Sequence, residues 1–149
     1  MTEYLETTVD KFTFKVITDR YYNGEGVWAK QDGKNIRIGL SDYLQQRSGD
    51  VAFAEIKPTG TDLAFGDEVA DIETIKVNIS LSSPVTGRVV EVNPMMETAP
   101  EAINQDPYGA GWLALIEASN WEADRSSLHD PQAYFARMKA EAEDETKKL

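Results

Sequence analysis

The segment from residue 72 to residue 87 constrains this chain most. Residues 72–77 (Ile-Glu-Thr-Ile-Lys-Val), followed by residues 83–87 (Ser-Pro-Val-Thr-Gly), are typical of two short strands joined by a tight turn, with one lysine near the turn. Gly66 lies ten residues before Lys76, and Gly87 lies eleven residues after it. This pattern predicts a hairpin that presents the primary amine of Lys76 where a modifying enzyme can reach it.

Similar short strands are predicted on both sides of this hairpin, separated by glycine, proline and asparagine. They cover residues 12–17, 27–29, 35–40, 51–56, 89–92 and 111–116. Short helices are expected at residues 41–46 and within 95–103, and Asp130 before Pro131 predicts the start of a C-terminal helix. Residues 1–11 are expected to be loose or to form a short helical lead-in, and the charged tail from residue 141 to residue 148 is expected to fray. Together these elements predict a mainly β protein, a β-sandwich or flattened barrel with helices at its edges.

Composition excludes several classes of function. A chain of 149 residues is expected to form one domain, and no apolar run approaches the roughly 20 residues that span a bilayer. The absence of cysteine excludes disulfides and thiol catalysis, and a single histidine, His129, gives no transition-metal site. No phosphate-binding glycine motif and no nucleophile elbow is present, so no catalytic residue is predicted. The expected location is the cytoplasm.

The charge of the chain is strongly negative. Its formal net charge is −11, which argues against binding to nucleic acid, because a phosphate backbone requires a basic face. Acidic residues crowd the segment that enters the predicted hairpin: Asp62, Asp67, Glu68, Asp71 and Glu73. A protein that docks at this end is expected to offer arginine or lysine.

Four segments, in this order, resemble the H protein of the glycine cleavage system. They are residues 38–43 with Gly49 and Asp50, residues 73–76, residues 83–87 with 91–93, and residues 100–104 with 106–112. The resemblance runs from about Tyr22 to the C-terminal helix. It implies a lipoyl/biotinyl-type β-sandwich (a flattened barrel of the hammerhead hybrid type) with short peripheral helices. It also implies an N-terminal extension over residues 1–20, one H-protein-like domain over 21–149, and a C-terminal helix from about residue 130.

The resemblance further implies that lipoate is joined to Lys76 by an amide bond. Biotin carriers flank their lysine with methionines, whereas Ile75 and Val77 flank this one. Glu73, three residues before the lysine, resembles the acidic residue that a lipoate ligase or lipoyltransferase meets in this family. Such a protein is a cofactor carrier and not an enzyme, because the redox chemistry belongs to the cofactor.

Two sites in the chain depart from the H-protein pattern. The family has a His-Glu-Trp run where this chain has Gly26, Val27 and Trp28, so Val27 lacks the carboxylate that suits a cationic cargo. Arg47 lies on the predicted short helix, where some members place a histidine facing the arm, and an arginine there favours an anionic cargo. These departures, together with the N-terminal extension, resemble the lipoate-binding proteins of bacterial sulfur oxidation, whose partner is a heterodisulfide-reductase-like complex.

Three functional hypotheses therefore follow from the sequence. The first is a lipoyl carrier in sulfur oxidation. The second is an H protein that serves glycine decarboxylase, aminomethyltransferase and dihydrolipoamide dehydrogenase. The third is an unmodified interaction module on the same fold. In each case an acidic protein that visits several partners is expected to be a monomer.

Overall fold

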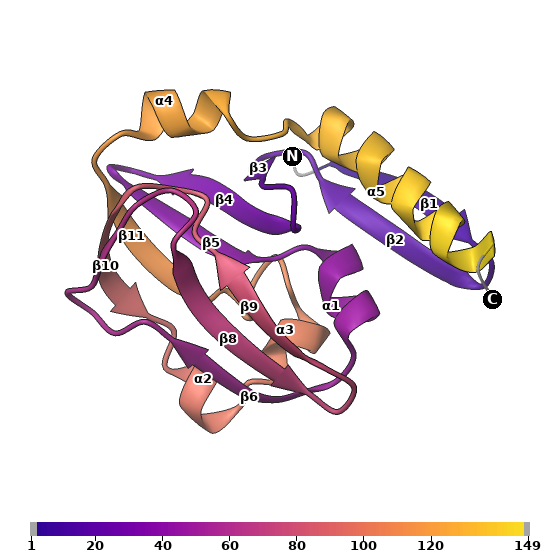
Figure 1. Cartoon of the computed structure of the whole chain (residues 1–149), viewed down its shortest axis with the longest axis horizontal. Coiled ribbons are helices and arrows are strands. Elements are labelled where there is room, and N and C mark those ends of the chain that lie inside the picture. The colour runs from indigo at the N-terminus through magenta and orange to yellow at the C-terminus, as the bar shows by residue number, and fades with distance from the viewer. Residues whose placement is uncertain (1–2, 148–149) are drawn as a thin grey trace.

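The computed structural model describes residues 3–147, which form three antiparallel sheets (Figure 1). The largest sheet has the strand order β3-β4-β5-β11-β10-β7. Its strands are β3 (Tyr21–Tyr22), β4 (Val27–Asp32), β5 (Asn35–Leu40), β7 (Asp62–Leu63), β10 (Gly87–Val92) and β11 (Ala114–Ala118). The second sheet has the order β6-β8-β9, with β6 (Val51–Ile56), β8 (Glu68–Thr74) and β9 (Asn78–Ser82). The third is a hairpin of β1 (Tyr4–Val9) and β2 (Phe12–Ile17).

The six-stranded and three-stranded sheets pack face to face around one apolar core. Alternate residues of their strands point inward, as expected for sheets that are buried on one face. Ile36 and Ile38 of β5 and Ile116 of β11 meet Ile72 of β8 and Leu81 of β9 in this core. Each of these five side chains is buried. This packing gives the β-sandwich that the sequence predicts.

Within residues 3–147, five helices lie at the edges of the sandwich. They are α1 (Asp42–Ser48), α2 (Met95–Thr98), α3 (Ala102–Gln105), α4 (Trp121–Ser126) and α5 (Pro131–Lys147). Ser41 caps α1 as predicted, because its side chain accepts a hydrogen bond from the amide of Leu44. Asp130 likewise caps α5 by accepting from the amide of Ala133 at 2.7 Å. Helix α4 was not predicted, and no helix within residues 3–147 is long and apolar enough to cross a membrane.

The predicted strand boundaries shift at several places, including the lysine hairpin and the last strand. The second strand of the lysine hairpin is β9, which ends before Ser83, so residues 83–86 connect β9 to β10 instead of forming the strand. The last strand of the sandwich begins at Ala114, three residues later than predicted. In both cases glycine or proline at the predicted start favours an irregular connection.

The N-terminal extension is neither loose nor helical, so that prediction is wrong for the described residues. Strands β1 and β2 pair along their whole length, and Asp10 turns the chain between them with a φ of 58°. The hairpin is stabilised by distant parts of the chain. Val9, Phe14 and Val16 are buried in a second apolar cluster that includes Tyr134 and other residues of α5.

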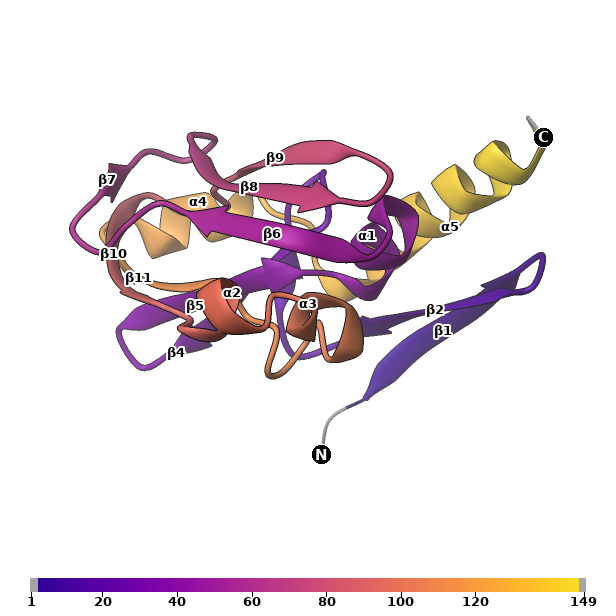
Figure 2. The same ribbon diagram turned by 90° about the horizontal axis from the view of Figure 1, so that it is seen from below.

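The prediction that the charged tail frays is also wrong, up to residue 147. Helix α5 continues to Lys147, and Ala142 is buried in the second apolar cluster. Residue 148 lies outside the described residues. Seen from below, α5 and the β1–β2 hairpin extend from the same side of the sandwich, with α1 near their base (Figure 2). The contacts of α5 with β1 and β2, and of α1 with β2, join the two elements to the sandwich.

Candidate functional site

Lys76 lies in the loop that joins β8 to β9. Glu73 and Asn78 form the last pair of the ladder, so residues 74–77 make the turn. The side chain of Lys76 is exposed, and its Nζ donates a hydrogen bond to the carbonyl oxygen of Arg47 at 3.4 Å. The amine therefore stands at the end of a hairpin, as the sequence predicts, and lies against the last turn of α1.

The hydroxyl of Thr74 fixes the shape of this loop. Its Oγ1 accepts hydrogen bonds from the amides of Lys76 at 3.2 Å and Val77 at 3.0 Å. The same hydroxyl lies 2.7 Å from the carbonyl oxygen of Ser48 and 2.9 Å from that of Val77, and donates its one proton between them. The backbone amide of Thr74 closes the turn by donating to the oxygen of Val77 at 2.8 Å. The buried side chain of Thr74 thus satisfies the amides of two residues in the turn.

The loop is anchored to the end of α1. The amide of Ile75 donates to the carbonyl oxygen of Asp50 at 3.0 Å. Gly49 ends the helix with a φ of 95°, which L side chains rarely adopt. A Cβ atom at this position would lie 3.1 Å from Cδ of Lys76. Glycine at position 49 therefore serves two purposes, since it turns the chain out of α1 and leaves space for the stem of the lysine.

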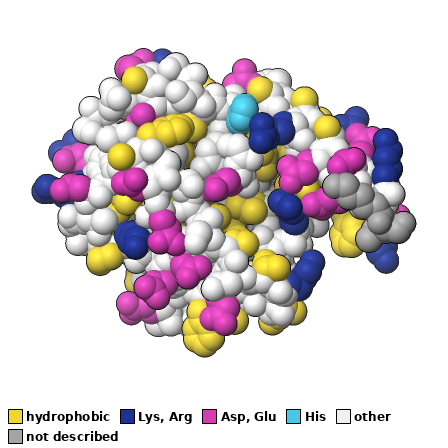
Figure 3. Space-filling model, viewed as in Figure 1, with side chains coloured by type: hydrophobic (Ala, Val, Ile, Leu, Met, Phe, Trp, Pro, Cys, Tyr) yellow, Lys and Arg dark blue, Asp and Glu magenta, His cyan; other side chains and the backbone are white. Residues whose placement is uncertain are grey.

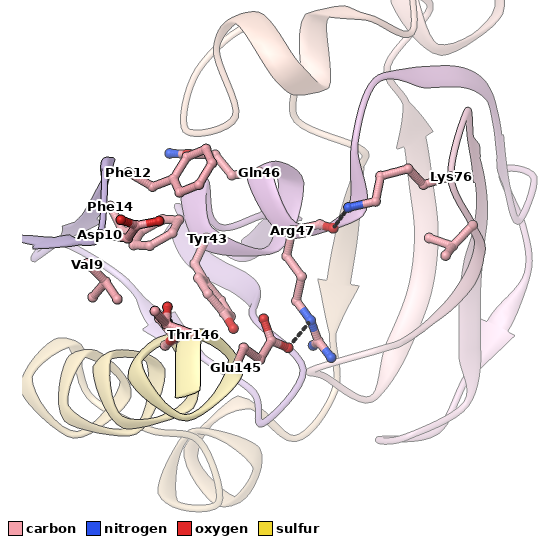
Figure 4. Close-up of a pocket in the computed structure, with 12 residues that line it drawn as sticks. Val9, Asp10, Phe12, Phe14, Tyr43, Gln46, Arg47, Lys76, Glu145 and Thr146 are labelled. Carbon is pink, nitrogen blue, oxygen red and sulfur yellow. Dashed lines mark hydrogen bonds and ion pairs between the residues drawn. The ribbon is translucent and has the colours of Figure 1, made fainter. Parts of the chain in front are cut away.

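A pocket of about 450 Å³ opens beside the lysine (Figure 4). Four parts of the chain form its walls: the turn of the β1–β2 hairpin, helix α1, the lysine loop, and the last turns of α5. Its lining residues are Val9, Asp10, Phe12, Phe14, Tyr43, Gln46, Arg47, Lys76, Val77, Ala142, Glu145 and Thr146. The aromatic side chains lie at the end away from Lys76, and Arg47 lies between them and the lysine.

The guanidinium of Arg47 is paired with two carboxylates of α5. Its Nη1 lies 2.9 Å from Glu141, and its Nε lies 3.0 Å from Glu145. These ion pairs join α1 to α5 across the pocket. They involve the same positive charge that the sequence analysis expected to favour an anionic cargo. In this arrangement two carboxylates compensate the positive charge of the guanidinium.

Tyr43 forms part of the pocket floor. Its hydroxyl is buried and has no hydrogen-bond partner among residues 3–147. Burial raises the pKa of Tyr43 above the usual range of tyrosine, and the carboxylates of Glu141 and Glu145 raise it further. The hydroxyl therefore keeps its proton and is a buried donor without an acceptor, which is uncommon in folded proteins.

The surface around the lysine loop is both apolar and acidic. Ile75 and Val77 beside the lysine are 75% and 46% exposed, and Phe53, which faces Glu73 in the β6–β8 ladder, is 68% exposed. Acidic side chains gather over β6 and β8 on the face that Figure 3 shows. This acidic face comprises Glu55, Glu68, Asp71 and Glu73, all of which are exposed. Because Glu55 and Asp71 are paired in the ladder, like charges stand opposite each other.

The structure thus brings Lys76 and Arg47 together and places Glu73 at the base of the same loop. Val27, which aligns with the family's glutamate, is fully buried in the sandwich core and lines no part of the pocket. The sequence analysis missed the roles of Thr74 and Tyr43. A threonine two residues before the turn lysine is a signal for a turn whose amides bond to the threonine hydroxyl. Nothing local in the sequence indicates that the hydroxyl of Tyr43 lacks a partner.

Comparisons with known proteins agree with one another. The family described as glycine cleavage H-protein matches residues 20–141. The glycine cleavage system H protein of Carboxydothermus hydrogenoformans is 38% identical over 125 residues, which cover 84% of this chain and 95% of that protein. The H protein of Thermus thermophilus is 36% identical over 124 residues, covering 83% of this chain and 96% of that protein.

A solved structure shows the same fold. The crystal structure of a glycine cleavage system H protein from Mycobacterium marinum is similar with a TM-score of 0.73 at 27% identity, and covers 80% of this chain and 96% of that chain. This similarity confirms the predicted lipoyl-type β-sandwich. Members of the family are lipoyl carriers and not enzymes, as predicted for this protein. The chain belongs to the glycine cleavage H-protein family.

Proposed function

We propose that this protein is a lipoyl carrier of the glycine cleavage type, with lipoate attached to Nζ of Lys76. The observation that supports this most directly is the exposed lysine on a loop that Thr74 holds in one shape, in a chain that belongs to the H-protein family. The partners are then glycine decarboxylase, aminomethyltransferase and dihydrolipoamide dehydrogenase, and a lipoate ligase or lipoyltransferase attaches the cofactor.

The residues around the lysine fit a lipoyl group. The amine is exposed and can form the amide bond, Gly49 leaves space for the lysine stem, and the neighbouring pocket offers apolar surface. When it is bound, lipoate supplies a disulfide that accepts electrons and becomes a pair of thiols that can carry cargo. The protein itself contributes a rigid base and a high effective concentration of the cofactor at a docked partner.

We place glycine cleavage before sulfur oxidation, which reverses the first expectation from the sequence. That expectation depended on a positive charge at Arg47 and a missing carboxylate at Val27. The pairing of Arg47 with Glu141 and Glu145 supports the reversal, as do relatives that are named glycine cleavage H proteins. Asp10 also lines the pocket beside Lys76, so this region has a carboxylate although position 27 has none.

Docking in this proposal uses the end of the sandwich that bears the lysine. Glu73 lies on the strand that enters the loop. An attaching enzyme that binds Lys76 therefore also contacts the carboxylate of Glu73. The exposed Ile75 and Val77 contribute apolar contact, and the acidic face adjoining the loop favours partners with arginine or lysine at the rim of their active site.

Intact mass of the protein from its own source, followed by peptide mapping of residues 66–88, tests the attachment. We expect one lipoyl increment on Lys76, absent in Lys76→Arg and retained in Lys34→Arg, which changes a lysine at another hairpin turn. An unmodified mass from cells that make lipoate would refute the carrier and leave the unmodified interaction module. Release of carbon dioxide from glycine by a glycine decarboxylase, dependent on the lipoylated protein, then tests the pathway, and failure there would return sulfur oxidation to first place.

A further inference from the structure

We propose that a second pocket, on the outer face of the six-stranded sheet, binds an oxyanion, the phosphate or carboxylate group of a small molecule. This basic pocket has a volume of about 480 Å³ and lies over strands β4 and β5. Its other walls are Arg20, which precedes β3, and the connection that contains residues 108–112. It shares no lining residue with the pocket beside Lys76, so the inference goes beyond the lipoyl carrier and does not depend on it.

Two cations face each other across the floor of the basic pocket. Ile36 and Ile38 of β5 are buried in the core, so Arg37 between them points to the outer face of the sheet. In the β4–β5 ladder, Arg37 stands directly opposite Lys30. Like charges at facing positions of a ladder are destabilising. In a chain whose net charge is −11, two facing cations in a pocket indicate a site for a negatively charged ligand.

The third cation, Arg20, is buried and only partly satisfied. The residue is 4% exposed, and its guanidinium lies over the ring of Trp28, 4.4 Å from the ring centroid. Its Nε pairs with Asp19 at 2.7 Å, and its Nη1 donates to the carbonyl oxygen of Tyr108 at 3.0 Å. Its Nη2 has no hydrogen-bond partner within residues 3–147. A buried guanidinium in a pocket wall with donors to spare is a second, independent sign of a ligand.

The charges of the basic pocket do not cancel. Asp19 serves two cations, because it pairs with Arg20 and lies 3.4 Å from Nζ of Lys30. Arg37 pairs with Asp32 at 2.9 Å. Three cations therefore share two carboxylates, and one positive charge remains. A bound oxyanion supplies the missing negative charge, and it removes the repulsion between Lys30 and Arg37.

The geometry of Arg37 suits an oxyanion. Its guanidinium stacks on the ring of Trp112, 4.3 Å from the ring centroid, which restricts the orientation of its planar group. Only its Nη2 has a hydrogen-bond partner within residues 3–147. Guanidinium groups bind carboxylate and phosphate through two parallel hydrogen bonds. The volume lies within the range of small-ligand sites, roughly 300–1,000 Å³, and leaves space for an organic group attached to the anion.

Backbone and indole NMR shifts of the ¹⁵N-labelled full chain, titrated with sodium phosphate, test the site. Sodium chloride keeps the ionic strength constant, because salt alone screens surface charges. We expect saturable shifts with a dissociation constant of about 1–10 mM, confined to residues of the basic pocket and including the indole of Trp112. Sodium acetate is titrated in the same way. The anion that binds more tightly identifies the group, phosphate or carboxylate, that the ligand carries.

Three variants locate the binding. Arg37→Gln should weaken it about tenfold, because a charged donor is lost, and Arg37→Lys should give an intermediate affinity, because it keeps the charge without the planar fork. Arg88→Gln is the matched control: Arg88 also pairs with an aspartate in the same sheet, at 3.0 Å, but does not line the basic pocket. It should leave the affinity unchanged.

The wild-type titration alone can overturn the proposal, whatever the variants do. Shifts that do not saturate by about 50 mM, or that spread over lysines and arginines elsewhere on the surface, would mean that the anions only screen charge. Equal affinities of wild type and a folded Arg37→Gln would also refute the site. The titration uses the chain with or without the lipoyl group, so its outcome does not bear on the attachment to Lys76.

Discussion

Replacing Thr74 by valine removes the hydroxyl that shapes the lysine loop while keeping the volume of the side chain. The hydroxyl accepts from the amides of Lys76 and Val77 and lies 2.7 Å from the carbonyl oxygen of Ser48, which is buried. The two loop amides regain water in the variant and cost about 0.5 kcal/mol each. The Ser48 carbonyl loses a partner away from water and costs about 1–2 kcal/mol. The free energy of unfolding should therefore fall by about 2–3 kcal/mol.

Urea unfolding measures this difference, and the midpoint should fall by roughly 1 M or more. Hydrogen exchange should also speed up at the amides of Lys76 and Val77, because their acceptor is gone. Thr74→Ser keeps the hydroxyl and removes only the methyl group, so it measures what the methyl group alone contributes to stability. Thr61→Val is the matched control, since its hydroxyl donates only to the oxygen of Pro58 in a partly exposed turn, and it should cost about 1 kcal/mol or less. If Thr74→Val costs no more than Thr61→Val and the two loop amides exchange as before, the hydroxyl does not organise the loop.

Three further predictions concern the same end of the molecule and its buried tyrosines. Gly49→Ala should lower the free energy of unfolding by about 2 kcal/mol in urea titrations, and by more than Gly33→Ala, because only position 49 adds a close contact with Lys76 to a positive φ. Arg47→Leu should lower the thermal midpoint by the equivalent of about 1 kcal/mol or less at low salt, and the difference should shrink in about 1 M salt; an unchanged difference would mean that the ion pairs to α5 are not the cause. Burial raises the pKa of Tyr134 to about 12, so the folded state binds more protons than the unfolded state above about pH 10. Stability should therefore fall there by at least about 1.4 kcal/mol per pH unit, and urea midpoints that stay flat up to about pH 11 would contradict it.

The lysine hairpin was predictable because its signals are local. The turn residues and alternating strand patterns around Lys76 all lie within about 20 residues of sequence. In the structure the loop that bears Lys76 lies between β8 and β9, as expected. Ser41 and Asp130 were equally local, since a capping side chain lies within three residues of the amide that it accepts from. The exact bounds of β9 and β11 were less predictable, because pairing partners decide where a strand ends.

The N-terminal hairpin and the pocket were not predictable in this way. Strand β1 has a weak pattern of its own and is held by α5, which begins more than 120 residues later in the chain. The last turns of α5 look fully charged in sequence, but Ala142 is buried and two of the glutamates pair with Arg47. The pocket joins four segments that are far apart in sequence, so its aromatic end and the unpartnered Tyr43 appear only after folding.

The like charges that stand opposite each other on β6 and β8 have a consequence for how the molecule behaves at high concentration. The end that bears Lys76 exposes Phe53, Ile75 and Val77, and such apolar tips tend to bring identical molecules together. Every copy carries the same acidic face and a net charge of −11, and both oppose association of identical molecules. Placing like charges opposite each other within one sheet costs stability, but it keeps the protein from associating with itself. The apolar tip can still bind a partner whose surface is cationic.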